Sequence, residues 1–262
     1  MDDAVRAPAV AGTFYPASAL ELGALVDRLL AAVTVPAGAP CPKALIVPHA
    51  GYVYSGPVAA SAFARVAPHG TRIERAVLVG PAHRLWVEGL VAPGAERLRT
   101  PLGDVEVDVA ALARGGFATS MAAHAREHCL EVELPFLQRV APRARVVPLL
   151  ASEASPAAVG AALEALWGGA ETLVVVSSDL SHYLPWAEGR AVDVETCARI
   201  VAGEAAIAGE RACGAVAING LLWVARRRGL RVELVDRRSS GDTAGSRDEV
   251  VGYAAFALYE DA

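Results

Sequence analysis

The sequence lacks the features that mark several common protein classes. No apolar run approaches the roughly 18 residues of a membrane-spanning helix. The N-terminal stretch MDDAVRAPAVAG has two acidic residues and no apolar centre, so no secretory signal is expected. The net charge of −5, from 24 basic and 29 acidic residues, argues against a nucleic-acid partner. The cluster Arg226-Arg227-Arg228 ends a predicted helix, where complementing the helix dipole explains it better than binding phosphate. We therefore expect neither a nucleic acid nor a membrane as partner.

Common catalytic motifs are missing as well. The chain has no GxSxG nucleophile elbow, no P-loop, no GxGxxG and no HExxH. These absences remove support for serine hydrolase chemistry, for phosphate or dinucleotide binding, and for the commonest type of zinc peptidase. The cysteines form no CxxC pair, which is typical of reduced thiols in a cytoplasmic protein. They are Cys41, Cys129, Cys197 and Cys213.

Short aliphatic runs alternate with helical patterns along the chain. The runs are ALIV (44–47), AVLVG (76–80), RVVPLL (145–150) and TLVVVSS (172–178). The helical patterns cover 18–30, 131–140, 155–167, 187–201 and 214–228, and further strands are expected at 231–238 and 250–260. Runs that are apolar on both faces are typical of strands covered by helices on both sides. The alternation predicts an α/β class protein: one domain over residues 1–262, an α/β/α sandwich with a mostly parallel central sheet.

Three of the six histidines follow directly after a predicted core strand. His49 follows ALIV, His83 follows AVLVG, and His182 follows TLVVVSS. In open α/β sheets the carboxyl ends of the strands form the ligand crevice, so we expect these histidines at one sheet edge. His83 comes 34 residues after His49, about one strand–helix–strand unit, which predicts neighbouring strands. Neutral imidazoles with a soft or anionic third ligand are typical of a transition-metal site.

The remaining histidines have simpler interpretations. His69 and His124 are expected to be surface or hydrogen-bonded residues. His128 begins the segment EHCLEVELPF, with Glu127, Glu131 and Glu133 close by. It could line the site or only cap the helix that follows.

Several motifs together resemble one known family. They are RAPAVAGTFYP, ALIVPHAGYVYSG, GPAHR, EHCLEVELPFLQ, VVVSSDLSHY and a late ACG. In this order they resemble the Memo family, whose bacterial and archaeal members are called AmmeMemoRadiSam system protein B. The resemblance runs from about Arg6 to the C-terminal strand. It implies a fold similar to that of class III extradiol ring-cleaving dioxygenases.

The resemblance also implies a metal site and its chemistry. The metal ligands would be His49, His83 and Cys213, and His182 would transfer protons with Asp179 beside it. The metal would be iron or copper, with zinc as a further choice. A thiolate in place of the dioxygenases' carboxylate softens the site, which favours Cu(I) or Zn, and makes it oxidisable. The family name further implies a radical SAM protein and an AMMECR-type protein as partners.

Two further expectations concern the surroundings of these residues. Tyr52, Tyr54 and Trp86 flank the expected ligands and are predicted to line a pocket for an aromatic substrate. Cys213 precedes a helix expected to start near Gly214, and a helix N-terminus lowers the pKa of a thiol.

The sequence leaves three functions open. The first is a metal-dependent redox protein or dioxygenase-like oxidoreductase acting on O2 or a small molecule. The second is a non-catalytic metal-binding or partner-binding protein that kept the pocket. The third is a thiol enzyme in which His182 or His49 activates Cys213. Asp179 and His182 could also form only a loop-stabilising hydrogen bond.

Overall fold

The computed structural model describes residues 4–260, which form a mixed sheet between layers of helices. Its strands are β1 (Val5–Arg6), β2 (Ala44–Val47), β3 (Arg75–Pro81), β4 (Leu90–Ala92), β5 (Arg97–Thr100), β6 (Gly103–Glu106), β7 (Ala118–Thr119), β8 (Arg145–Ala151), β9 (Thr172–Ser177), β10 (His182–Leu184), β11 (Arg231–Ser239) and β12 (Val250–Tyr259). Its helices are α1 (Ala19–Ala31), α2 (Tyr52–Val66), α3 (Val109–Gly115), α4 (Met121–Ala125), α5 (Leu134–Val140), α6 (Pro156–Leu166), α7 (Trp186–Val201), α8 (Ala215–Arg228) and α9 (Ser240–Thr243). Two 3-10 helices cover Ala67–Arg72 and Glu131–Glu133.

The centre of the large sheet consists of four parallel strands in the order β2-β9-β3-β8. Their side chains are almost entirely buried, because helices cover both faces of these continuous aliphatic runs. Antiparallel strands extend the sheet on both sides, with β12, β10 and β11 beyond β2, and β4 beyond β8. The predicted α/β sandwich is therefore confirmed, with a parallel centre and a mixed periphery.

One expectation about strand order is wrong. His49 and His83 follow β2 and β3, which were predicted to be neighbours, but β9 lies between them and pairs with both. The chain reaches β9 only after about ninety further residues, a long-range pairing that local sequence patterns do not reveal.

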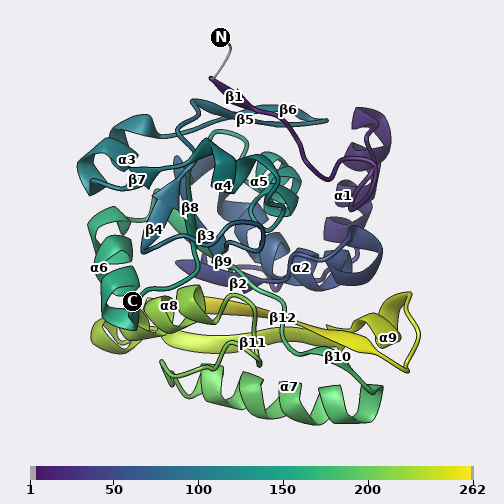
Figure 1. The fold of residues 1–262 in the computed structure, drawn as a ribbon. Coiled ribbons are helices and arrows are strands. Elements are labelled where there is room, and N and C mark those ends of the chain that lie inside the picture. The colour runs from purple at the N-terminus through teal and green to yellow at the C-terminus, as the bar shows by residue number, and fades with distance from the viewer. Residues whose placement is uncertain (1–3, 261–262) are drawn as a thin grey trace.

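Helices pack on both faces of the sheet (Figure 1). Helix α2 contacts β2 and β12 and is covered in turn by α1 and α5, whereas α8 contacts β3 and β9 and packs against α6. Figure 1 shows α7 below the β11–β12 hairpin, on the side away from α2. This layering buries the strands and leaves the loops after their carboxyl ends to form a surface.

Several helix ends follow the signals in the sequence. Ser18 caps α1 and Ser155 caps α6, each accepting a hydrogen bond from a backbone N–H of the first turn. Pro156 stands at the first helical position of α6. Gly229 ends α8 with φ of 70°, the left-handed conformation that favours glycine.

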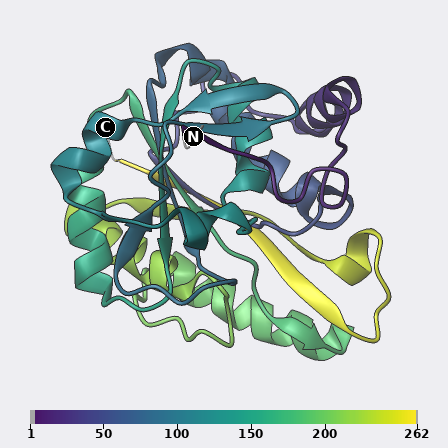
Figure 2. The same ribbon diagram turned by 45° about the horizontal axis from the view of Figure 1, so that its top comes forward.

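The N-terminal segment is held against the middle of the chain (Figure 2). Strand β1 pairs with β5, and β5 pairs with β6, to form a second, three-stranded sheet. The Arg6 guanidinium is buried, donates to the carbonyl oxygen of His124 at 3.1 Å, and pairs with the Glu131 carboxylate. This buried ion pair fixes the segment that leads to Phe14, and the ring of Phe14 contacts the ring of His128.

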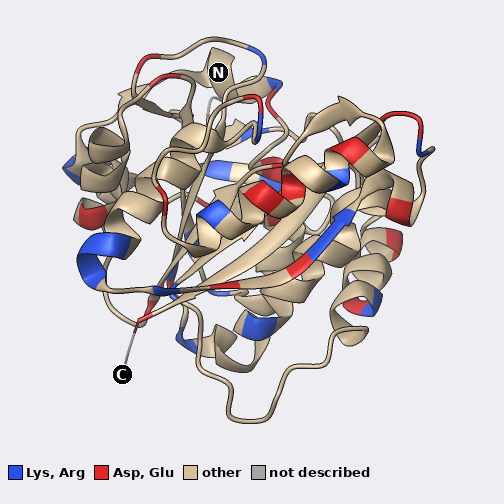
Figure 3. Cartoon of the chain, turned by 90° about the horizontal axis from the view of Figure 1, so that it is seen from below, with Lys and Arg blue, Asp and Glu red and all other residues tan. Residues whose placement is uncertain are grey.

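Charged residues of both signs are interspersed on the face seen from below (Figure 3). Strand β11 carries residues of both signs, and its Arg231 and Arg238 pair with the nearby Glu233 and Asp236. Within residues 4–260, no helix is both long enough and apolar enough to cross a bilayer.

Candidate metal centre

The loops after β2, β3 and β9 converge at one edge of the sheet, as predicted. His49 lies two residues after β2, His83 two residues after β3, and Asp179 two residues after β9. His182 opens β10, which pairs with the edge of β12. Cys213 comes from a different direction, immediately before Gly214, the residue that caps α8.

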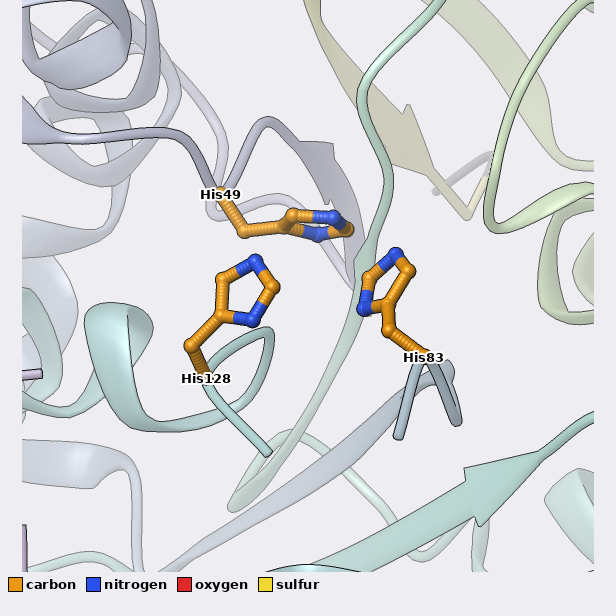
Figure 4. Close-up of side chains that lie close together, drawn as sticks. All are labelled: His49, His83 and His128. Carbon is orange, nitrogen blue, oxygen red and sulfur yellow. The ribbon is translucent and has the colours of Figure 1, made fainter. Parts of the chain in front are cut away.

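Three imidazole rings face one another at this edge (Figure 4). The ring centroids of His49 and His83 are 5.2 Å apart, those of His49 and His128 5.4 Å, and those of His83 and His128 4.9 Å. Each ring offers a nitrogen that lies within 4.8 Å of a nitrogen of the other two. Such mutual distances allow three nitrogens to bind one metal ion. We call these three residues the histidine cluster.

The buried carboxylate of Glu127 orients two members of the histidine cluster. It accepts hydrogen bonds from the backbone N–H of His83 at 2.6 Å and from His83 Nδ1 at 2.9 Å. It also accepts from the backbone N–H groups of His128 at 2.8 Å and Cys129 at 3.1 Å. Although burial alone raises the pKa of Glu127, the bonds from His128 and His83 hold it well below its usual range. An ionised Glu127 fixes the proton of His83 on Nδ1 and leaves Nε2 with a free lone pair.

His49 is the most enclosed member of the cluster, with 1% of its surface exposed. Its backbone N–H donates to Asp179 Oδ1 at 2.8 Å, and its Nδ1 lies 2.7 Å from Ser177 Oγ. Burial, reinforced by the neighbouring His83 and His128, lowers the pKa of His49 well below its ordinary value. The ring is therefore neutral, the form that binds metals.

The thiol of Cys213 adjoins the histidine cluster. Its Sγ lies 3.3 Å from His49 Nε2 and accepts a hydrogen bond from the backbone N–H of Asp179 at 3.3 Å. Cys213 and His83 also line the same cavity, of about 190 Å³. The expectation of a lowered thiol pKa is wrong: burial, together with the Asp179 charge, raises the pKa of Cys213 to about 12. The helix N-terminus does not offset this desolvation.

Larger hollows lie elsewhere on the surface. One of about 490 Å³ is lined by Arg75, Arg143 and Arg145 among others. Arg75 and Arg145 open β3 and β8, so this hollow lies at the amino ends of the strands, away from the histidine cluster.

Comparison with known proteins identifies the family of the chain. The family model described as Memo-like protein matches residues 6–257. The chain belongs to the Memo family. A MEMO1 family protein of Archaeoglobus fulgidus is 37% identical over 276 residues, covering 96% of this chain and 98% of that protein. MEMO1 family proteins of Ignicoccus hospitalis and Aquifex aeolicus are each 34% identical, covering 96% and 95% of this chain and 97% of each relative.

In this Memo protein, Asp179 and His182 have different surroundings. Asp179 is buried, and burial raises the pKa of its carboxyl to about 6 against the opposing hydrogen bond from His49. His182 is half-buried, and its ring meets Tyr183 edge-on with the centroids 5.7 Å apart. No hydrogen bond joins Asp179 to the His182 ring in the described part of the chain. The purely loop-stabilising pair considered from the sequence is therefore not formed.

The three predicted pocket aromatics have separate positions. Tyr52 is 3% exposed and packs its ring against Tyr15 and Phe136, so the structure places it in the core and corrects the pocket assignment. Tyr54 lies half-exposed in the first turn of α2, one turn after the His49 loop. Trp86 is 63% exposed and lines a hollow with Glu88 and Glu153 rather than with the histidine cluster. Tyr54 and Trp86 remain predictions as substrate contacts.

The simpler interpretation of two histidines is confirmed. His69 Nε2 bonds the carbonyl oxygen of Ala39 at 3.0 Å, and His124 Nε2 bonds that of Val91 at 2.8 Å. Neither residue belongs to a group of potential metal ligands among the described residues. His128, which the sequence left open, instead joins the cluster, and Phe14 of the N-terminal segment packs on its ring at 4.9 Å.

Proposed function

We propose that the protein is a metal-dependent redox protein that binds copper or iron at the histidine cluster. The ligands are His49, His83 and Cys213, with His128 as a further imidazole donor. The observation that carries the proposal is the meeting of three imidazoles beside a thiol 3.3 Å from His49 Nε2. A bound copper or iron ion would supply one-electron redox chemistry.

The donor set fits a soft or borderline metal. Imidazole suits copper, iron and zinc, while a thiolate adds preference for Cu(I) and zinc. The protein prepares these donors before a metal arrives, because Glu127 holds His83 in one tautomer and burial keeps His49 neutral. The Cys213 thiol must lose its proton on metal binding, so loading releases a proton to solvent.

The half-exposed His182 supports an oxidoreductase that handles protons beside the metal. Its imidazole is reachable from solvent, and it lies outside the group of potential ligands among the described residues. A side chain with these properties can exchange protons with a substrate. We propose an aromatic or other small molecule, or O2 itself, as the substrate.

A non-catalytic metal-binding protein is the second candidate. The thiol in place of the dioxygenases' carboxylate supports it, because a soft ligand set stores Cu(I) or zinc well. A thiol enzyme has less support, because a Cys213 thiol with a pKa of about 12 is a poor nucleophile at neutral pH.

Metal analysis tests the proposal directly. The protein is purified without oxygen, its metal content is measured, and Cu(I), Fe(II) and Zn(II) are titrated against competing chelators. His49→Ala, His83→Ala and Cys213→Ala should each lose tight binding. His69→Ala and Cys41→Ala serve as matched controls, since His69 bonds only a backbone carbonyl and neither residue adjoins the cluster. Stoichiometric metal in Cys213→Ala would remove the thiol from the site.

An oxygen assay separates the two candidates. Oxygen consumption is measured with the metal-loaded protein and a panel of catechols. Turnover above that of His182→Ala supports the oxidoreductase. Stoichiometric metal without turnover supports the binding protein.

Partners and location are proposals that rest on the family resemblance and on the cysteines. We propose that the protein works with a radical SAM protein and an AMMECR-type protein, which co-purification from the native source would test. All four cysteines are free thiols, and we propose a cytoplasmic location on that ground.

A further inference from the structure

The hydroxyl group of Ser177 makes three contacts below the histidine cluster. Its Oγ lies 2.7 Å from His49 Nδ1, 2.8 Å from the carbonyl oxygen of Cys129 and 2.9 Å from Glu133 Oε1. Ser177, Glu133 and His49 are each no more than 1% exposed. Each contact has hydrogen-bond length, and three separate hydrogen bonds need three hydrogen atoms.

Counting hydrogens fixes the direction of all three bonds. A serine hydroxyl has one hydrogen to give and two lone pairs to accept with. The carbonyl oxygen of Cys129 can only accept, so it takes the Ser177 hydrogen. The other two partners must therefore donate to Ser177 Oγ. His49 donates from Nδ1–H, and Glu133 donates from a protonated carboxyl group.

We propose that Glu133 is a neutral carboxylic acid and a positioning residue, which donates to Ser177 and thereby holds His49 as its Nδ1–H tautomer. The Nε2 lone pair of His49 then faces the thiol of Cys213. The role of this tautomer in metal binding rests on the proposed function, because a metal would bind the Nε2 lone pair of His49. The tautomer and the protonated acid are properties of the metal-free protein.

The second oxygen of Glu133 supports a neutral carboxyl group. Glu133 Oε2 is buried and has no hydrogen-bond partner among the described residues. An ionised carboxylate with a bare buried oxygen is far more costly than a neutral acid in the same place. Burial raises the pKa of Glu133 well above its ordinary value, and the nearby Asp179 adds to this. Glu127, six residues earlier, is held ionised by four N–H donors, which Glu133 lacks.

Infrared difference spectroscopy tests the protonation state. The spectrum of Glu133→Gln is subtracted from that of the unaltered metal-free protein at neutral pH. We expect a carbonyl band of a protonated carboxylic acid that disappears in the variant. Loss of a carboxylate band instead would overturn the inference.

Nitrogen NMR of the histidine rings tests the tautomer. His49 should carry its proton on Nδ1 in the unaltered protein and in Glu133→Gln, because the glutamine amide also donates to Ser177 Oγ. Glu133→Met should shift His49 toward a mixture of tautomers, because Ser177 is then free to donate to Nδ1. Ser177→Ala should release the constraint altogether. An Nε2–H tautomer in the unaltered protein, or the same tautomer in all variants, would overturn the inference.

Metal titration connects the inference to the site. Ser177→Ala should bind Cu(I) about 10–100-fold more weakly, the loss typical of groups that orient a ligand. Glu133→Gln should bind as the unaltered protein does, and Glu133→Met more weakly. Ser61→Ala is the matched control, since its buried hydroxyl donates to Val58 O at 2.6 Å within α2 and touches no histidine. If Glu133→Gln weakened Cu(I) binding as much as Glu133→Met, a negative charge on Glu133 would be needed, and this would contradict the inference.

A failure of the metal proposal can be distinguished from a failure of the inference about Glu133 and His49. If neither the unaltered protein nor the variants bind Cu(I), Fe(II) or Zn(II), the metal proposal fails. The infrared and NMR results still decide the protonation of Glu133 and the tautomer of His49. Thermal unfolding of each variant, followed by circular dichroism, shows which variants are folded. Where Ser177→Ala does not fold, Ser177→Cys provides the second measurement, because a thiol accepts hydrogen bonds only weakly.

Discussion

Replacing Glu127 by glutamine is the sharpest test of how the histidine cluster is held. The carboxylate accepts four N–H groups, three at Oε1 and one at Oε2. A glutamine keeps three of these bonds by placing its amide oxygen at the Oε1 position. Its NH2 group then faces the backbone N–H of His83, and two donors oppose each other.

The magnitude follows from this geometry. One buried donor left unpaired costs about 1–3 kcal/mol, and the three remaining bonds lose their charge-assisted strength. We therefore expect the free energy of unfolding of Glu127→Gln to fall by about 2–3 kcal/mol. We expect metal affinity to fall by about 10–100-fold, because His83 is no longer held rigidly in the ligating tautomer.

Glu131→Gln is the matched control. Glu131 is also buried and also accepts several donors, but these come from Arg6, Tyr15 and the backbone of the N-terminal segment. It should lose stability without losing metal affinity. Stability is measured by denaturant unfolding of the metal-free proteins, and affinity by Cu(I) competition. Unchanged affinity in Glu127→Gln, or an equal loss in Glu131→Gln, would refute the orienting role.

Three further predictions concern single side chains. Burial lowers the pKa of His124 to about 4, so below its ordinary value near 6.5 the unfolded chain binds a proton that the folded chain does not. Stability should therefore fall by about 3 kcal/mol between pH 6.5 and 4, and His124→Gln should remove this part of the acid dependence in urea unfolding. His182→Ala should keep the metal, because His182 is outside the ligand group, and lose most oxygen-dependent turnover; loss of metal would make His182 a ligand. Tyr183 is 71% exposed at φ of 59°, so Tyr183→Gly should stabilise the protein by about 1 kcal/mol, and a lower melting temperature would show that its ring contact outweighs the strain.

The sequence predicted best those features that depend on a short stretch of neighbouring residues. Continuous aliphatic runs gave the four parallel strands because such runs are stable only between two helical layers. Ser18, Ser155 and Gly229 marked helix ends because capping depends on the residue at the end itself. The histidines after β2 and β3 met because a parallel sheet brings its carboxyl ends to one edge.

Other elements had no local signal. Helix α2 contains Pro57 and is buried on most sides, so it lacks the one-sided apolar stripe that predicts a surface helix. The position of β9 between β2 and β3 depends on long-range pairing. His128 follows no strand, and its ring joins the cluster only because the loop before the 3-10 helix Glu131–Glu133 folds under His49 and His83. Its three nearby glutamates were the signal that pointed to this loop.

Those three glutamates explain how one short segment holds the site. Glu127 has four N–H donors, which outweigh the cost of burial and keep it ionised beneath His83 and His128. Glu133 faces one hydroxyl group, too little to hold a charge, and so we infer that it is an acid that donates to Ser177 Oγ, which also accepts from His49 Nδ1. Glu131, between them, pairs with Arg6 and fixes the N-terminal segment whose Phe14 packs on His128. The number of donors around Glu127 and Glu133 therefore decides whether each carboxyl group accepts or donates, and that difference sets which ring nitrogen of His83 and of His49 carries the proton.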